Sequence, residues 1–269
     1  MRLLRIGLLP LALLLAAACE KERTPLGPPP PCKAGEVCGT VAATGGNGVG
    51  SGGAGGDGGQ GGATFGDLGG TVAVLNSSAF DATDPYTGLA SMLVLLENGT
   101  ETAPYDGVSP FLFEDLPTGS FWLLATPSPV GALLPVFTIH SVPSNSIVAP
   151  ILDVEVLNDI ALQLPGQPLP QLGAAQIILK VERSGFPLEG VAVLGDTADA
   201  VVAYDVGLGT FSSDVLTTGT AGMVLLLNAF GSGDIETTTL ILQDEALTEY
   251  LVDIPITAGA VTFATFELR

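Results

Sequence analysis

Few residues in this sequence have the types and spacing that chemistry requires. His140 is the single histidine, and it lies in the apolar stretch 136–142. A catalytic base needs a nucleophile within reach, whereas Ser141 points to the opposite face of a strand because successive side chains alternate. The sequence holds no Gly-x-Ser-x-Gly turn and no Cys/His cluster with zinc-ligand spacing. We therefore expect a structural histidine, no catalytic residue, no metal and no other cofactor.

Carboxylates are numerous but scattered. Three close pairs fall in expected loops, where oxygen ligands could hold calcium or could simply form turns: Asp81 with Asp84, Asp196 with Asp199, and Asp234 with Glu236. None of the pairs matches an EF-hand or a nonapeptide repeat, so turns are the expected role. Paired acids could also hydrolyse glycosides, but Trp122 is the single tryptophan, and its place in an expected strand favours packing over a sugar platform.

The first nineteen residues carry an export signal. Arg2 and Arg5 precede a short apolar run over 6–15, and three alanines lead to Cys19. This order is typical of a secretory signal peptide, which we place at 1–18, and the run is too short to span a bilayer. The alanines and Cys19 resemble the lipobox of bacterial lipoproteins, although Ala16 stands where leucine is more common. The resemblance implies lipid on Cys19, and the alternative is a plain cleaved signal.

The other two cysteines follow closely. Cys32 and Cys38 form an even pair in a loop bounded by glycine and proline. In an exported chain they predict a disulfide, with free thiols or half of a metal site as alternatives. Residue 20 is Glu rather than the Asp that often marks inner-membrane retention, so the lipoprotein resemblance implies an exported protein that its lipid holds in the membrane, with the outer membrane favoured.

Charge and hydropathy limit the partners. Without Arg2 and Arg5 the chain keeps six basic side chains against 28 acidic ones, a net charge of about −22. Such a surface repels phosphate backbones, so we expect no nucleic acid partner. Hydrophobic residues make up 47% and charged residues 13%, which favours packed cores. No apolar run after Cys19 reaches the ~18 residues of a membrane helix, so the lipid is the expected membrane contact.

Residues 19–68 predict a lipidated N-terminus and a flexible tether. Prolines occupy 28–31, and twelve of the eighteen residues over 45–62 are glycine. Such a chain behaves as a coil whose mean span is roughly 40 Å for this length. No lysine, strand or helix frames the glycines, so a phosphate-binding loop is not indicated.

The rest of the chain predicts an all-β fold. Short apolar runs alternate with turn residues, and no long window has helical periodicity. The runs in the first set are 71–75, 92–96, 111–113, 121–125, 133–139 and 147–157; those in the second are 175–181, 191–194, 201–204, 223–227, 238–242, 250–254 and 261–268. Their spacing indicates two tandem antiparallel, Ig-like sandwiches of about seven strands with Greek-key order, at 69–164 and 172–269, joined by the proline-rich 165–170.

Two stretches resemble the carboxypeptidase regulatory-like and Cna-B-like sandwich families. Residues 85–97 and 111–125 carry a strand, a glycine-bearing turn and a Phe-x-Phe-x-x-Leu-Pro-x-Gly-x-Phe pattern. Residues 185–193 and 218–226 carry a looser version that lacks the Leu-Pro-x-Gly element. Leu116 can fill a core end while Pro117 and Gly119 make the following turn. The resemblance implies an accessory, stalk or adhesion module.

Cna-B-like domains sometimes contain an intramolecular amide bond between lysine and an Asn or Asp. The resemblance makes Lys180 the candidate lysine, Asn228 the partner, and Glu189 or Asp205 the acid. The last strand offers no Asn, and a plain solvent-facing Lys180 is the alternative.

The leading hypothesis is a non-enzymatic, lipid-anchored envelope protein, expected as a monomer, that displays sandwich modules for structural or binding purposes. Its membrane contact is the lipid, and its ligand is a protein or a glycan. The second hypothesis is a carbohydrate- or calcium-binding accessory module. The third, a hydrolase, predicts a polar cleft with coupled acids.

Overall fold

A computed structural model describes residues 38–39, 64–81, 83–195, 200–207, 209–229 and 231–269. Cys19, Cys32, most of the tether and the pair Asp196/Asp199 lie outside these residues. The first half of the body contains nine strands and a helix. Their bounds are β2 Phe65–Leu75, β3 Thr83–Pro85, β4 Leu89–Leu96, β5 Gly99–Tyr105, β6 Phe111–Pro117, β7 Gly119–Ser128, β8 Leu133–Leu134, β9 Val136–Val142, β10 Ser144–Asp153 and α1 Val154–Ala161.

The second half contains another nine strands, and β1 Cys38–Gly39 precedes both halves. The bounds are β11 Ala175–Arg183, β12 Phe186–Pro187, β13 Ala192–Leu194, β14 Val201–Gly207, β15 Thr210–Ser212, β16 Met223–Ala229, β17 Glu236–Gln243, β18 Glu249–Ile256 and β19 Val261–Glu267. The all-β prediction is confirmed.

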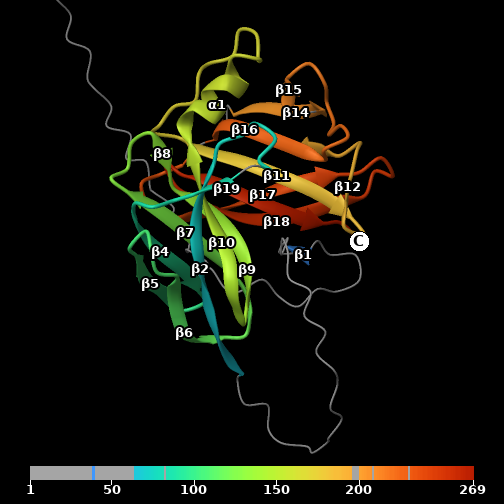
Figure 1. The fold of residues 1–269 in the computed structure, drawn as a ribbon. Helices are drawn as coiled ribbons and strands as arrows, with labels where there is room; N and C mark the ends of the chain where they lie inside the picture. The colour runs from blue at the N-terminus through green and yellow to red at the C-terminus, as the bar shows by residue number, and fades with distance from the viewer. Residues whose placement is uncertain (1–37, 40–63, 82, 196–199, 208, 230) are drawn as a thin grey trace, which may run out of the picture.

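One long sheet runs through both halves (Figure 1), in the order β15-β14-β16-β11-β19-β9-β7-β4-β5. In the first half it faces a second sheet ordered β3-β2-β10-β8, with β6 beside β2. In the second half it faces a third sheet, β13-β17-β18. Each half is therefore a sandwich, and the two sandwiches share a layer. The junction is the parallel pairing of Val261 and Thr262 on β19 with Val136 and Phe137 on β9.

The sheets are mixed rather than purely antiparallel. Besides β19 with β9, β10 pairs in parallel with β2 and β11 pairs in parallel with β19. The division into two separate domains at 69–164 and 172–269 stays a prediction, because one sheet contains strands of both halves. β2 begins at Phe65, four residues inside the expected tether.

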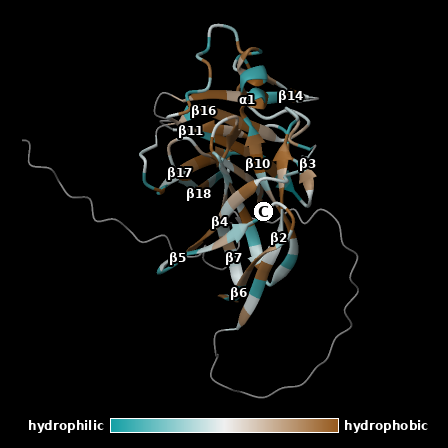
Figure 2. Cartoon of the chain, turned by 60° about the vertical axis from the view of Figure 1, so that its left-hand side comes forward, coloured by the Kyte–Doolittle hydropathy of each residue, from teal (hydrophilic) through white to brown (hydrophobic). Residues whose placement is uncertain are grey.

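Hydrophobic side chains fill the space between the layers. One cluster lies inside the first sandwich and includes Leu116 and Leu123, and another lies inside the second and includes Ile177 and Leu179. A third cluster draws on both halves, joining Leu157 of α1 to strands of the second half. Figure 2 shows β11 and β16 mostly in the hydrophobic colour. Those strands are apolar on both faces because each face meets a separate core.

Helix α1 corrects the sequence prediction, which made 147–157 a single strand. The strand ends at Asp153, whose carboxylate accepts the N–H of Glu155 at 3.0 Å and so caps the helix. Val156, Leu157 and Ile160 then lie on one face and are buried. Among the residues that the structure describes, no helix is long and apolar enough to cross a membrane.

We expect Leu157→Ala to destabilise both halves together. Leu157 is fully buried in the shared cluster, so the truncation leaves a cavity and should cost about 2–5 kcal/mol of unfolding free energy. Leu162→Ala is the matched control, because this leucine at the end of α1 is 75% exposed. Urea unfolding followed by Trp122 fluorescence, with hydrogen exchange of peptides from each half, measures the effect. A loss confined to one half would show that the shared cluster does not couple them.

Candidate functional site

An open hollow of about 460 Å³ lies at one end of the first sandwich. Its polar lining comes from β2, β6 and the start of β10, and comprises Asp67, Asp115, Ser144 and Asn145. Phe65 lies at its edge and is 58% exposed.

Two irregularities in strand pairing build this cavity. Between β2 and β6 the register moves from Gly66–Leu116 to Leu68–Phe113, so Glu114 and Asp115 oppose Asp67 alone. Such a bulge bends the strand and redirects a side chain. Asp115 has a φ of 55°, in the left-handed region, and its N–H donates to Oδ1 of Asp67 at 3.3 Å. The bulge therefore places the carboxylate of Asp67 against the backbone of Asp115.

The second irregularity lies on the other side of β2. Between β2 and β10 the register moves from Leu68–Ser144 to Gly70–Ile147, so Asn145 and Ser146 oppose Gly69. A Cβ atom at Gly70 would clash with the carbonyl oxygen of Ile147. Glycine is therefore required where the backbones approach so closely. Strand β2, which carries Asp67, thus lies between the bulge of β6 at Asp115 and the bulge of β10 at Asn145, and all three residues line the hollow.

This arrangement offers hydrogen-bond acceptors, an amide and an exposed aromatic face, which suits a hydroxyl-rich ligand better than a reaction. Asp67 and Asp115 are both exposed, whereas the general acid of glycoside hydrolysis needs a desolvated setting. Within the described residues, no group of three His, Cys, Asp or Glu side chains is placed to hold a metal ion.

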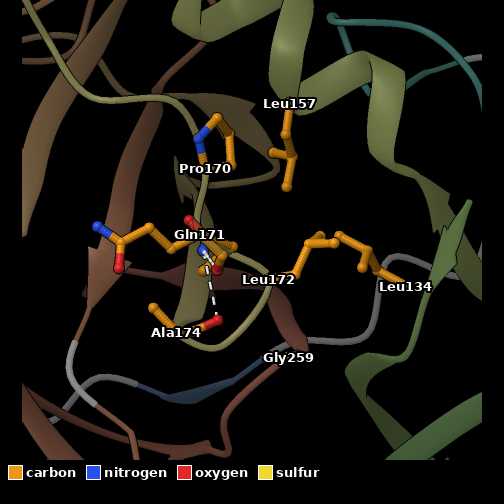
Figure 3. A pocket seen from close by; sticks show the side chains of 8 residues that line it. Leu134, Leu157, Pro170, Gln171, Leu172, Ala174 and Gly259 are labelled. Carbon is orange, nitrogen blue, oxygen red and sulfur yellow. Dashed lines mark hydrogen bonds between the residues drawn. The ribbon is translucent and has the colours of Figure 1, made fainter. Parts of the chain in front are cut away.

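A second, smaller hollow lies at the joint between the halves. Figure 3 shows Leu134, Leu157 and Leu172 around it, next to the chain at Gln171 and Ala174. It has no room for a water molecule. The buried amide of Gln176 bonds to the carbonyl oxygens of Gln171 and Ala174 at 3.2 and 3.3 Å. This hollow is a packing gap between the two halves, and residues 170–172 and 174 of the connecting segment lie against it.

His140 is a buried strand residue. Its Nε2 lies 2.9 Å from Oγ1 of Thr138, its Nδ1 has no hydrogen-bond partner, and burial lowers its pKa to about 4. Ser141 faces the other side, where its Oγ lies 3.4 Å from that of Ser120. The structure therefore keeps His140 and Ser141 apart, as the alternation predicted.

In the two expected carboxylate pairs that lie within the described residues, side chains accept hydrogen bonds from neighbouring polar side chains, and Asp84 and Glu236 lie in strands β3 and β17 rather than in loops. Asp84 accepts from the amide of Asn76 at 2.6 Å, and Asp81 accepts from Ser77 at 3.1 Å. Glu236 accepts from Ser232 Oγ at 2.8 Å. Trp122, predicted as a core residue, is half-buried and packs against the second-half core from the face opposite Phe121 and Leu123.

The candidates for an intramolecular amide bond are not brought together. Lys180 lies opposite Met223, five residues along β16 from Asn228, which corresponds to about 17 Å. The Lys180 amine lies 2.8 Å from a carboxylate oxygen of Glu182. Asn228 instead accepts the N–H of Gln171 at 2.6 Å.

The two acids proposed to catalyse the amide bond, Asp205 and Glu189, also have other surroundings. Asp205 is buried and accepts the N–H groups of Gly219, Ala221 and Met223 at 2.6–3.1 Å. Glu189 is exposed. Asp205 thus holds the loop before β16 in place.

No family model matches the sequence, and no curated protein matches it. Three solved structures show distant similarity. They are the shaft pilin SpaA from Lactobacillus rhamnosus GG (11% identity, 77% of this chain and 98% of the pilin, TM-score 0.23), the Bacillus anthracis TIE protein (10%, 76% and 34%, 0.21), and the minor pilin GBS52 from Streptococcus agalactiae (11%, 74% and 94%, 0.20). We draw no functional conclusion from similarity at this level.

We expect acid to weaken the fold partly through His140. Its ordinary pKa is 6.5 and its folded pKa is about 4. Between these values the unfolded chain binds a proton that the folded chain does not, so unfolding free energy falls by about 3 kcal/mol as pH drops from 6.5 to 4. His140→Gln should lose this component while every carboxylate titrates as before. Denaturant curves across this range measure it, and parallel pH profiles for the two proteins would contradict it.

Proposed function

We propose that this chain is a non-enzymatic, lipid-anchored protein of the cell envelope that displays its β-sandwich body on a tether. The observation that carries the proposal is the partition of the chain. A signal-like start ending in Cys19 precedes a glycine- and proline-rich stretch, and a β body with filled aliphatic cores follows. Lipid at Cys19 holds one end, and the outer membrane is the proposed location.

The proposed role of the body is structural or binding, with the chain as a monomer and a protein or glycan as ligand. Its net charge makes nucleic acid an improbable ligand, because 24 acidic side chains over 64–269 stand against Lys180, Arg183 and Arg269. Strand side chains that point inward are used for packing, so contacts with a partner fall to loops and sandwich ends.

Lipid attachment is tested by Cys19→Ser. We expect the native protein to partition into detergent and the envelope fraction, because one acyl chain contributes ~0.8 kcal/mol per buried methylene. The variant should appear in the soluble fraction, and intact mass should show the lipid only on the native protein. Cys32→Ser is the control and should stay in the envelope. An unmodified Cys19 in the mature protein, or a Cys19→Ser protein that remains membrane-bound, would refute the anchor.

A second function, glycan binding at the cavity of Asp67, Asp115 and Asn145, is favoured by its shape and lining. Phe65 presents a ring beside acceptors that suit sugar hydroxyls. Calcium at the same carboxylates is the alternative for this site, since carboxylate and amide oxygens are its preferred ligands.

We expect a glycan array, screened with and without calcium, to give a hit whose affinity falls at least about tenfold in Phe65→Ala and in Asp67→Asn. The matched control is Phe186→Ala, since Phe186 is 73% exposed in the second half, on β12. Titration calorimetry with the hit glycan measures both. Binding only with calcium would indicate a bridging ion, and absence of binding in both conditions would remove this function while leaving the display proposal intact.

A further inference from the structure

Strand β19 has an edge that the body leaves largely unpaired. On one side it pairs with β11 along its whole length, from Val261 to Glu267. On the other side β9 pairs with it only at Val261 and Thr262. On that side residues 263–267 have no pairing with β9, so this part of β19 is an open edge of the body. Unpaired N–H and C=O groups on such an edge form a template for another strand.

The tether supplies a strand at this edge. Cys38 pairs with Glu267 and Gly39 with Phe266 in an antiparallel ladder, where Figure 1 places β1 beside the body. These residues lie 26 positions before the start of β2, so the contact is not a consequence of chain proximity.

The sequence around Cys38 is richer in β-branched residues than the rest of the tether, and such residues favour strand pairing. Residues 36–42 read Glu-Val-Cys-Gly-Thr-Val-Ala, with β-branched residues at 37, 40 and 41. Such residues favour strands. The flanking segments, prolines at 28–31 and the glycine-rich 45–62, are depleted of them. The tether therefore carries one short segment suited to the edge of β19.

Charge does not oppose this occupant. Over 64–269 the acidic and basic side chains give a net charge of −21. The segment 19–38 has no net charge, because Lys21, Arg23 and Lys33 are balanced by Glu20, Glu22 and Glu36. It can therefore approach the acidic body without net repulsion.

We propose that the open edge of β19 is a docking site for the chain's own tether, which adds there as an antiparallel strand centred on Cys38–Gly39. Main-chain pairing of this kind is a recurrent mode of recognition. It divides the tether in two. With the tether docked, the free segment runs over 19 residue-to-residue steps from Cys19 to Cys38 and has a mean span of about 24 Å. Without docking, the free segment would run over 45 such steps from Cys19 to Thr64 and have a mean span of about 37 Å. Docking goes beyond the display role, and it does not require the lipid.

Crosslinking through the native Cys38 tests the register. The test uses chain 19–269 with Cys19→Ser and Cys32→Ser, so that Cys38 is the only native cysteine left. A second cysteine is introduced by Thr265→Cys. Residue 265 lies two positions from Glu267, the partner of Cys38, which puts the two cysteines within about 8 Å across the ladder. Thr237→Cys is the matched control, because Thr237 is an exposed residue of β17 in the third sheet. With a short bismaleimide we expect intramolecular crosslinking at 265 to be at least about tenfold faster than at 237. Thr265 is the less exposed of the two, so accessibility alone would favour the control.

Proline variants separate docking from chance encounters. Successive N–H groups of a strand point to opposite edges, so Gly39→Pro with Thr40→Pro removes the N–H that faces β19. We expect this double variant to lower the crosslinking rate at residue 265 to the rate at residue 237. The double variant Gly45→Pro with Gly46→Pro is the control and should keep the faster rate at residue 265. Thermal unfolding of the body should be unchanged in both. Equal rates at 265 and 237, a rate that proline does not alter, or crosslinks formed between chains would each overturn docking by the chain's own tether.

Discussion

The two apolar faces of the central strands impose the main constraint on this molecule. Side chains alternate along β11, so Ile177 and Leu179 enter one core while Ile178 enters another. A single facing sheet can cover only one of these surfaces. The sheet of β13, β17 and β18 covers the face that carries Ile177 and Leu179. The face that carries Ile178 is covered by α1 and by strand ends from the first half of the body. Burying both faces is what joins the halves, and the parallel contact of β19 with β9 follows from it.

Much of the strand pattern could be predicted because apolar runs and turn residues are local signals. Several short elements escaped, and β5 and α1 show the physical reasons. β5 reads Gly-Thr-Glu-Thr-Ala-Pro-Tyr, and its place depends on pairing with β4 rather than on hydrophobicity. α1 is only eight residues long and follows a strand without a break, so its valines and leucine read as strand. Which distant strands become neighbours, including all three parallel pairs, has no local signal.

The candidate cavity was missed for the same reason. Asp67 and Asp115 lie 48 positions apart, and a bulge is a property of two paired strands rather than of one segment. The one local hint was Gly69–Gly70 directly before the predicted strand 71–75, since glycine in a strand often marks a bulge or a close backbone approach. By contrast, the placement of His140 and Ser141 on opposite faces of one strand could be predicted, because it required only strand alternation.

The acidity of the body has a structural use beyond solubility. Only two ion pairs occur among the described residues, yet several carboxylates accept main-chain N–H groups at turns. Asp106 receives those of Val108 and Ser109, and these bonds lower its pKa. Asp244 accepts from Arg183, which lowers its pKa most, and holds the turn between β17 and β18 through Thr248. A lowered carboxylate pKa contributes stability above the unfolded value that is lost as pH falls through the folded one. Buried His140 acts in the same direction at higher pH. Turns held by carboxylates therefore give a body that is less stable in acid.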